Sequence, residues 1–344
     1  MRLQLNQTEF KIGVIGGGSW GTALANLLAL KGYKIDLWVF EKDIVEQIKT
    51  ERLNKLFLPG ILLSDNIIPT NNFEKAVSEK DILLIVVPSH FIRNIAGEIQ
   101  KYVSPQTVIL TASKGIENQT SYTMSRVLKE VITKISEKNF AAISGPSFAR
   151  EVAKKTPTAI VASCCDQSVA KKIQLIFATD YFRVYTNNDL IGTEIGGAIK
   201  NVIAIASGMI DGLKLGLNTR AALISRGLAE IRRLGLKMGA KPETFLGLAG
   251  AGDLILTCTG NLSRNYILGK RVGEGEKLKE ITENSKMIAE GVKNSESVYN
   301  LSKRLNIEMP ISNAVYHILY KDMAPMDALI KLMTRDLKHE FEQT

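Results

Sequence analysis

The sequence predicts an α/β protein in which a doubly wound parallel sheet, over residues 1–188, is followed by an all-helical region, over residues 189–344. Three observations predict this fold class. Short apolar runs alternate with stretches of helical periodicity up to about Asn187, as strands and crossover helices do. The strand-like runs stop after Asn188, and a glycine-rich turn follows the first apolar run. The 344 residues are enough for two domains with separate cores.

The first half contains seven runs that we expect to be strands. Several of them are almost entirely apolar, which is typical of strands buried on both faces of a parallel sheet. The runs cover residues 11–15, 34–40, 81–87, 107–111, 140–143, 158–162 and 182–185. The helices expected between them cover residues 19–31, 91–103, 120–135 and 167–178.

In the second half, apolar residues recur at the spacing of a buried helix face. The expected helices cover residues 189–213, 219–238, 264–272, 292–305, 313–320 and 326–332. No internal repeat and no Pro/Ser linker separates the two halves. We therefore expect the domains to pack closely, with the ligand site in a cleft between them.

Composition is typical of a globular protein, with 23% charged and 45% hydrophobic residues. Residues 1–10 lack the basic start and apolar core of a signal peptide. The best apolar stretch, residues 201–210, is too short to cross a bilayer. We expect a soluble, cytoplasmic protein without a membrane span.

The cysteines and histidines exclude several kinds of chemistry. Cys164 and Cys165 are adjacent and Cys258 is alone, so a disulfide framework is not expected and a reducing compartment is. The three histidines are scattered, so neither a metal site nor a His-based triad is predicted. A proton carrier, if the protein is an acid–base enzyme, is therefore expected to be Lys, Asp or Glu.

The net charge of +9 is compatible with anionic partners. The basic residues are dispersed, however, and no basic run is interleaved with aromatic residues as a base-stacking surface requires. We expect no nucleic-acid partner. The charge either is a solvated surface feature or attracts small anionic ligands.

The glycine-rich turn fits G-x-G-x-x-G through Gly16, Gly18 and Gly21. The first glycine permits a tight turn, the second lets a pyrophosphate approach the backbone, and the third lets the helix pack closely on the strand. The helix that begins near Ser19 offers free N–H groups to phosphates. Because the turn follows one strand and leads through a helix to another, it predicts a Rossmann-type dinucleotide site. A turn used only for packing is the alternative.

The end of the second strand is expected to meet the adenosine ribose of the dinucleotide. Glu41 lies about there and favours the free hydroxyl of NAD, whereas Lys42 favours the 2′-phosphate of NADP. The sequence leaves the choice between NADH and NADPH open.

Two loops follow strands, where ligands collect in open α/β sheets. "TASKGIE" places Lys114 after one strand, and "ISGPSFARE" places Gly145 and Ser147 after another. Either loop is also compatible with simple turn chemistry, and a lone lysine is often only a surface residue.

Two further stretches in the second half carry polar groups in unusual settings. "GGAIKNVIAIASGMIDG" places Lys200 in an otherwise apolar helix, where a lysine is costly unless it is paired or faces a cleft. "GLAGAGDLILTCTGNLSRN" holds Asp253 and then Ser263, Arg264 and Asn265 at the start of a helix. A capping serine beside an arginine suits a phosphate monoester, although it is also an ordinary structural feature.

Together these motifs resemble NAD(P)-dependent glycerol-3-phosphate dehydrogenase, especially the bacterial type, over about residues 11–332. The stretches that carry the resemblance are "GGGSWGTALA", "VVPSHF", "SKGIE", "SGPSFAREV", "GGAIKNVIAIASGMIDGL", "TRAALISRGLAEI", "GAGDLILTCTGNLSRN" and "AEG". The resemblance implies reversible reduction of dihydroxyacetone phosphate to glycerol 3-phosphate, which supplies phospholipid synthesis. It also implies a possible homodimer.

The resemblance also implies roles for individual residues. Lys200 is implied to be the catalytic proton carrier, and Lys114 to reach both substrate and coenzyme. The implied substrate-binding residues are Lys114, Gly145, Ser147, Lys200, Asp253, Ser263, Arg264 and Asn265. The implied coenzyme positions are Ser19, Trp20, Phe40, Lys114, Ala149, Arg264, Ile288 and Glu290, in addition to the glycines of the turn. Phe40 with Glu41 replaces the basic residue of many bacterial members, and Ile288 stands where valine is common.

The chemistry agrees with these roles. As the coenzyme's hydride reaches the C2 carbonyl, negative charge grows on oxygen, and Lys200 and Lys114 can stabilise it. Lys200 can then deliver the proton, with a pKa lowered by burial and a neighbouring cation, while Asp253 orients it. A hydroxy-acid dehydrogenase would need a carboxylate clamp instead. A non-catalytic dinucleotide sensor would have no reason to place Lys200 in an apolar helix.

Overall fold

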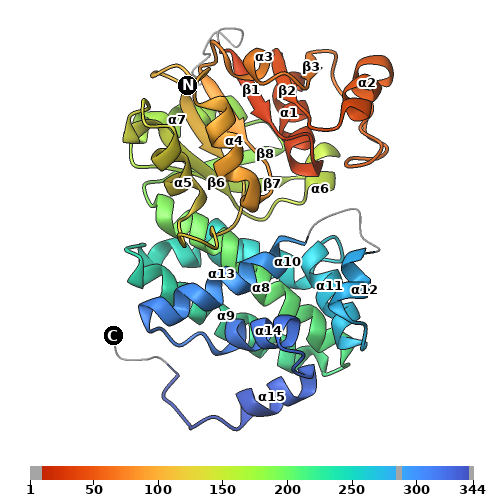
Figure 1. Ribbon diagram of the computed structural model, residues 1–344, viewed down its shortest axis with the longest axis vertical. Helices are drawn as coiled ribbons and strands as arrows, with labels where there is room; N and C mark the ends of the chain where they lie inside the picture. The colour runs from red at the N-terminus through yellow and green to blue at the C-terminus, as the bar shows by residue number, and fades with distance from the viewer. Residues whose placement is uncertain (1–9, 284–288, 341–344) are drawn as a thin grey trace.

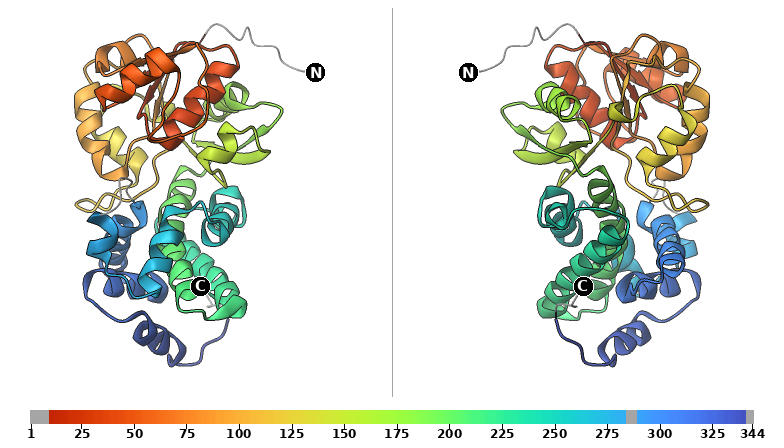
Figure 2. Two further views of the ribbon diagram at one scale, coloured as in Figure 1. Left: turned by 90° about the vertical axis from the view of Figure 1, so that its right-hand side faces the viewer. Right: turned by 90° about the vertical axis from the view of Figure 1, so that its left-hand side faces the viewer.

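The computed structural model describes residues 10–283 and 289–340. Residues 1–9, on which most of the signal-peptide argument depends, and Ile288 lie outside the described residues. The described chain forms a sheet region with helices on both faces, stacked on a helical region along the long axis of the molecule (Figures 1 and 2). The predicted fold class is confirmed.

The sheet has eight strands in the order β3-β2-β1-β4-β5-β6-β7-β8. The strands are β1 (Ile12–Ile15), β2 (Ile35–Trp38), β3 (Ile67–Thr70), β4 (Ile82–Ile85), β5 (Val108–Thr111), β6 (Phe140–Ser144), β7 (Thr158–Cys164) and β8 (Phe182–Asn187). The chain order reverses between β1 and β4, which is the point where open α/β sheets bind ligands, outside the carboxyl ends of their strands.

Helices cover both faces of the sheet (Figure 1). They are α1 (Ser19–Leu30), α2 (Lys42–Glu51), α3 (Phe73–Val77), α4 (Ile92–Ile99), α5 (Met124–Val131), α6 (Ala149–Ala153) and α7 (Gln167–Phe177). In β4, Ile82 and Leu84 join the core under α1 and α7, whereas Leu83 and Ile85 join the core under α4 and α5. Because alternate residues face opposite sides and both sides are buried, the strand reads as a continuous apolar run.

The helical region is built around α8, which runs through its centre (Figure 1). Its helices are α8 (Leu190–Gly212), α9 (Gly216–Lys237), α10 (Asp253–Thr259), α11 (Arg264–Gly273), α12 (Leu278–Glu283), α13 (Glu290–Leu305), α14 (Pro310–Tyr320) and α15 (Pro325–Met333). A 3-10 turn (Pro242–Leu246) and a π-helical turn (Leu248–Gly252) lead into α10.

Two expectations about the sheet are wrong. β7 runs antiparallel to β6, so the sheet is mixed rather than wholly parallel. The connection between them contains only α6, whose five residues span about 7.5 Å and are too few to carry the chain back along the sheet. In addition, β3 is absent from the predicted strands, because Pro69 interrupts its apolar run. Pro69 is tolerated there because β3 is an edge strand.

The expectation about apolar length also needs correction. Within the described part of the chain, α8 is long and apolar enough to cross a membrane by length and composition. However, 94% of its most apolar window is buried inside the protein. The helix is apolar on all sides because neighbouring helices surround it, as expected for the central helix of a globular domain.

Candidate active site

The glycine turn after β1 leaves room for a ligand. Gly16 has a φ of 122°, and a Cβ on Gly21 would lie 1.9 Å from the Gly16 carbonyl oxygen, so both positions need glycine. A Cβ on Gly18 would meet no atom within 4 Å, so nothing in the protein itself requires a glycine there. Gly18 is the N-cap residue of α1, whose first turn has no acidic side chain. The turn therefore fits a dinucleotide pyrophosphate against the helix N-terminus.

Two residues of α1 predicted to contact the coenzyme lie beside this turn. Ser19 begins α1, and its hydroxyl donates to the carbonyl of Phe57 at 2.6 Å. Trp20 is partly buried and packs against the core of the sheet. The loop that holds Phe57 therefore borders the predicted coenzyme site.

The residues after β2 lie where the ribose is expected. The strand ends at Trp38, and Phe40 beyond it is 76% exposed. Glu41 is the N-cap residue of α2 and is partly buried, whereas Lys42 begins the helix and is exposed. Both charged residues lie at this position, so the structure leaves the choice of coenzyme open.

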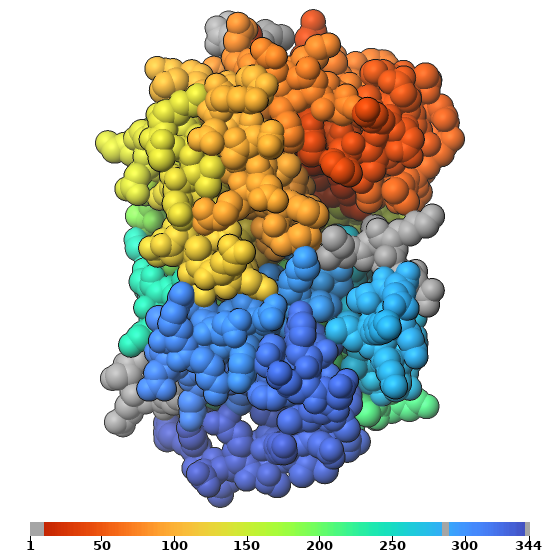
Figure 3. Space-filling view, viewed as in Figure 1, coloured from red at the N-terminus to blue at the C-terminus, as the bar shows by residue number. Residues whose placement is uncertain are grey.

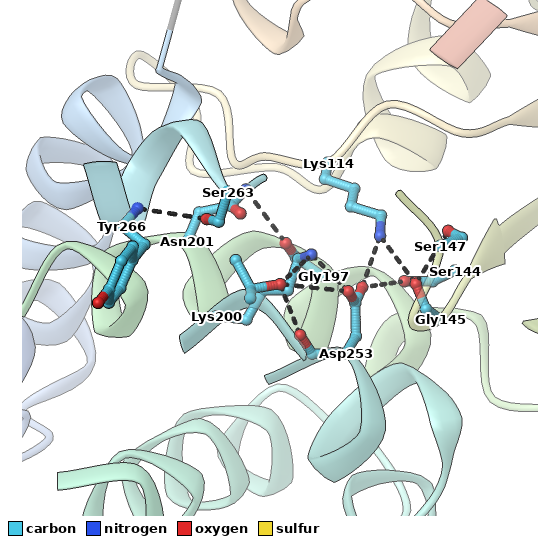
Figure 4. Close-up of polar contacts among 11 residues, drawn as sticks. Lys114, Ser144, Gly145, Ser147, Gly197, Lys200, Asn201, Asp253, Ser263 and Tyr266 are labelled. Carbon is cyan, nitrogen blue, oxygen red and sulfur yellow. Dashed lines mark hydrogen bonds and ion pairs between the residues drawn. The ribbon is translucent and has the colours of Figure 1, made fainter. Parts of the chain in front are cut away.

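A buried carboxylate joins the two lysines singled out in the sequence (Figure 4). Asp253 is 1% exposed, and its two oxygens pair with the Nζ atoms of Lys114 and Lys200, each at 2.5 Å. Lys114 comes from the loop after β5 in the sheet region, and Lys200 comes from the middle of α8. The side chains are 17% and 9% exposed, respectively. The cluster therefore lies at the junction of the two regions, where a cleft was predicted.

The surroundings shift the pKa values of this cluster. Burial lowers the pKa of Lys200 from 10.5 to about 8; Asp253 opposes that shift and the Lys114 ammonium reinforces it. Burial acts to raise the pKa of Asp253, but the charges of Lys114 and Lys200 outweigh it and hold the pKa below its ordinary value. Asp253 is therefore an ionised acceptor, and Lys200 is an ammonium that can lose its proton close to neutral pH.

Small and polar neighbours set the positions of both lysines. A Cβ on Gly197 would lie 3.0 Å from the Ser144 hydroxyl and 3.4 Å from the Lys114 side chain, so this glycine lets Lys114 pass over α8. Thr257 accepts a bond from Lys200 Nζ at 2.8 Å and donates to the Asp253 carbonyl at 2.6 Å. Ser144 donates to Asp253 at 3.4 Å.

Thr257 and Ser144 are not among the site residues predicted from the sequence. Thr257 stands four residues after Asp253, so the two share one face of α10. That spacing was the available signal for Thr257. Ser144 ends β6, directly before Gly145, and its place at the carboxyl end of a strand was the corresponding signal.

The loop after β6 borders the same cluster. The carbonyl of Gly145 accepts from Lys114 Nζ at 3.5 Å and from the Ser147 hydroxyl at 3.1 Å. Gly145 has a φ of 142°, a backbone conformation that favours glycine at this position. Ala149 begins α6 and is partly buried.

The predicted phosphate-binding residues lie at the start of α11. The Ser263 side chain caps the helix by accepting from the Tyr266 N–H at 3.2 Å, as the sequence predicted. Arg264 is exposed. Asn265 is buried, and its carbonyl oxygen accepts from the Gly291 N–H at 2.9 Å, which leaves its amide nitrogen as the group available to a phosphate.

Glu290 begins α13 near the same helix start. Burial raises the pKa of Glu290 to about 7, and the charges of Arg264, Lys114 and Lys200 oppose the shift. The arginine, the glutamate and the lysine cluster are therefore electrostatically linked. Ile288, the remaining predicted coenzyme residue, lies outside the described residues.

Comparisons with known proteins identify the family. Residues 11–170 match the model of the NAD-dependent glycerol-3-phosphate dehydrogenase N-terminus, and residues 189–330 match that of its C-terminus. The glycerol-3-phosphate dehydrogenase [NAD(P)+] of Geobacter sulfurreducens is 53% identical over 96% of this chain and 98% of its own. That of Syntrophobacter fumaroxidans is 50% identical over 96% and 97%.

A solved structure is similar in fold as well as in sequence. The glycerol-3-phosphate dehydrogenase of Coxiella burnetii superposes with a TM-score of 0.91 at 39% identity, covering 95% of this chain and 99% of that one. The two family models together match most of the chain, and both cover elements that form the site. The chain is therefore an NAD(P)-dependent oxidoreductase and belongs to the NAD-dependent glycerol-3-phosphate dehydrogenase family.

Proposed function

We propose that the chain catalyses the reversible, NAD(P)H-dependent reduction of dihydroxyacetone phosphate to sn-glycerol 3-phosphate, with Lys200 as the proton donor and acceptor. This reaction supplies the glycerol phosphate of phospholipids. The observation that carries the proposal is the buried Lys200–Asp253–Lys114 cluster at the junction of the two regions. Family membership supports the reaction and its coenzyme class.

The chain's own groups hold the coenzyme and the reacting carbon. The turn of Gly16, Gly18 and Gly21 would receive the pyrophosphate, and the other proposed coenzyme contacts are Ser19, Trp20, Phe40, Lys114, Ala149, Arg264, Ile288 and Glu290. When bound, NAD(P)H supplies the hydride for C2. Holding both reactants at the cleft replaces a bimolecular encounter with a reaction between positioned groups.

The two lysines would stabilise the negative charge on the C2 oxygen, and one of them would transfer a proton to it. Lys114 and Lys200 present positive charge where the alkoxide develops, in a site with little water. Lys200 then transfers a proton to that oxygen, and Asp253 stabilises the ammonium and fixes its direction. In oxidation, neutral Lys200 accepts the proton from the substrate hydroxyl.

The phosphate would be bound away from the chemistry. Ser263, Arg264 and Asn265 offer a hydroxyl, a guanidinium and an amide at the N-terminus of α11, whose dipole also favours an anion. Gly145 and Ser147 border the substrate on the side of the sheet region. Binding energy from the phosphate would position the carbonyl, whose reduction gains from correct orientation.

The assay that tests the function is oxidation of NADH or NADPH in the presence and absence of dihydroxyacetone phosphate. We expect both coenzymes to be used, with kcat/KM for NADH at least comparable to that for NADPH, because Glu41 opposes a 2′-phosphate while Lys42 attracts one. Glu41→Ala should shift the ratio toward NADPH, and Lys42→Ala toward NADH. A wild-type preference for NADPH of about a hundredfold or more would show that Glu41 points away from the ribose.

The two directions are expected to depend on pH in opposite ways. Reduction needs protonated Lys200, so kcat/KM for dihydroxyacetone phosphate should fall as pH rises through about 8, the pKa of this lysine. Oxidation needs neutral Lys200, so kcat/KM for glycerol 3-phosphate should rise through the same range. Initial rates above about pH 7, where the substrate phosphates are already ionised, separate this effect from substrate titration. Parallel pH profiles would contradict the role of Lys200.

The proposal also covers the division of the chain into domains, its location in the cell and its oligomeric state. We propose a dinucleotide-binding domain over residues 1–188 and a substrate-binding helical domain over residues 189–344, in a cytoplasmic enzyme that forms a homodimer. Gel filtration with light scattering tests the dimer, and expression of residues 1–188 alone tests whether the first domain folds and binds NADH.

A further inference from the structure

The loop that carries Lys114 is a compact hairpin. We refer to residues 112–123, between β5 and α5, as the Lys114 loop. An antiparallel bridge joins Ile116 to Thr123, and the Glu117 N–H donates to the Tyr122 carbonyl at 2.9 Å. Arg93 forms two bonds of 2.8 Å with the Glu117 carboxylate. The bridge ties the end of the loop at Thr123 to Ile116, two residues after Lys114, so the positions of that end and of Lys114 are linked.

One side of the Lys114 loop is tied to α13. The Ser297 hydroxyl donates to the Ile116 carbonyl at 2.9 Å, and Asn118 donates to Glu296 at 2.7 Å. Arg304 donates to the Thr120 carbonyl at 3.0 Å. In Figure 3, yellow atoms of the sheet region lie directly against blue atoms of the helical region at the junction of the two regions.

The helix that follows the Lys114 loop, α5, is held at its start by a carboxylate that the mechanism does not use. Glu194, on α8, accepts from the Ser125 N–H at 2.7 Å and from the Ser125 hydroxyl at 2.5 Å. Ser125 lies in the first turn of α5, where the N-cap residue, Thr123, makes no side-chain cap bond of its own. Glu194 thus caps a helix of the sheet region from the central helix of the other region.

The carboxylate of Glu194 is buried, and burying a charged group costs free energy unless it is hydrogen-bonded. Glu194 is 6% exposed and Ser125 is 4% exposed. Burial raises the pKa of Glu194, and its bonds to Ser125 oppose the shift. Losing Glu194 would leave the buried N–H and hydroxyl of Ser125 without these bonds, so the contact strongly favours one position of α5 against α8.

Glu194 and Lys200 share α8 and are six residues apart, about 9 Å along the helix axis. The same rigid helix therefore holds the end of the Lys114 loop through Glu194 and bears the lysine of the active site. We infer that Glu194 is a positioning residue, which sets the place of Lys114 against Asp253 and Lys200 by holding Ser125. The inference rests on the proposed function, since its readout is the reduction of dihydroxyacetone phosphate.

The inference predicts a specific electrostatic effect. The Lys114 ammonium is one of the causes that lower the pKa of Lys200. If Lys114 is displaced, that cause weakens, so the pKa of Lys200 rises and the fall of kcat/KM for reduction moves to higher pH. A loss of stability alone would not shift this pH profile.

The test is a double-mutant cycle on the full-length enzyme. Glu194→Ala should lower kcat for reduction on the order of tenfold and shift the pH profile upward. In a Lys114→Ala background, the same substitution should change kcat by less than about twofold, because the group that it positions is absent. Glu194→Gln should restore activity, since its oxygen accepts from the Ser125 N–H and its amide donates to the hydroxyl.

The chain offers a matched control in Glu230 on α9. This carboxylate is 2% exposed and caps α14 by accepting from the N–H groups of Ile311 and Ser312 at 2.6 and 3.1 Å, away from the Lys114 loop. Glu230→Ala should cost comparable stability without moving the pH profile. If Glu194→Ala does not fold, as judged by circular dichroism, Ser125→Ala replaces it in the cycle.

The outcomes separate this inference from the proposed function. A wild-type enzyme that does not reduce dihydroxyacetone phosphate would refute the function itself. With an active wild-type enzyme, an equal loss in both Lys114 backgrounds, or the same pH profile in the Glu194 and Glu230 variants, would overturn the positioning role alone. A loss that disappears in the Lys114→Ala background, together with the shifted profile, would establish it.

Discussion

Replacing Lys200 with alanine is expected to lower kcat for dihydroxyacetone phosphate reduction by a factor on the order of 10²–10⁴, the usual effect of losing a positioned acid–base group. The Lys200 side chain is 9% exposed, and its ammonium bonds to Asp253 and Thr257. These contacts oppose the alternative that the lysine only extends its stem to reach water. The variant should fold, because Lys114 still pairs with the buried Asp253. Steady-state kinetics with saturating NADH measure the effect.

Two controls bring out the chemical role of Lys200. Lys200→Arg should not restore activity, because a guanidinium keeps its proton and has a different shape. Lys270→Ala, which removes an exposed lysine of α11, should leave kcat unchanged. A folded Lys200→Ala enzyme that binds NADH and keeps more than about a tenth of wild-type kcat would refute the assignment and make Lys114 the next candidate.

Arg264→Ala is expected to raise KM for dihydroxyacetone phosphate strongly. A charge-assisted bond to a phosphate contributes about 1.5–3 kcal/mol, which corresponds to roughly 10- to 150-fold in KM. The exposed guanidinium follows the capping Ser263 at the start of α11, where the helix dipole attracts the same anion. The measurement is KM at saturating NADH, and inorganic phosphate as an inhibitor reports the same site.

The matched control for Arg264 lies on the same helix. Arg271 pairs with Glu276 at 2.5 Å near the other end of α11, so Arg271→Ala removes an equal charge from the protein but not from the proposed phosphate site. Its KM should stay at the wild-type value. An unchanged KM in Arg264→Ala would remove this residue from the substrate site.

Features encoded locally were predicted well. The turn of Gly16, Gly18 and Gly21 needs only its own sequence and the strand before it, and the positive φ of Gly16 and the close packing at Gly21 match the predicted reasons for these two glycines. The cap at Ser263 bonds to an N–H three residues ahead, so its signal is complete within one turn of helix. The sheet was harder, because Pro69 hid the edge strand β3 and the direction of β7 depends on how far the connecting chain can reach.

The sequence by itself determined the fold class, the dinucleotide turn and the presence of a charged residue, Lys200, in an otherwise apolar helix. Each of these depends on periodicity or on neighbours along the chain. Asp253 was expected to orient Lys200, but only the tertiary structure decided that one carboxylate pairs with both Lys200 and Lys114. Asp253 lies 53 residues from Lys200 and 139 from Lys114 in the sequence, yet all three meet in one buried cluster. Folding removes water from these charges. The pKa of Lys200 then depends on burial and on where the other two charges lie. No local sequence pattern encodes those positions.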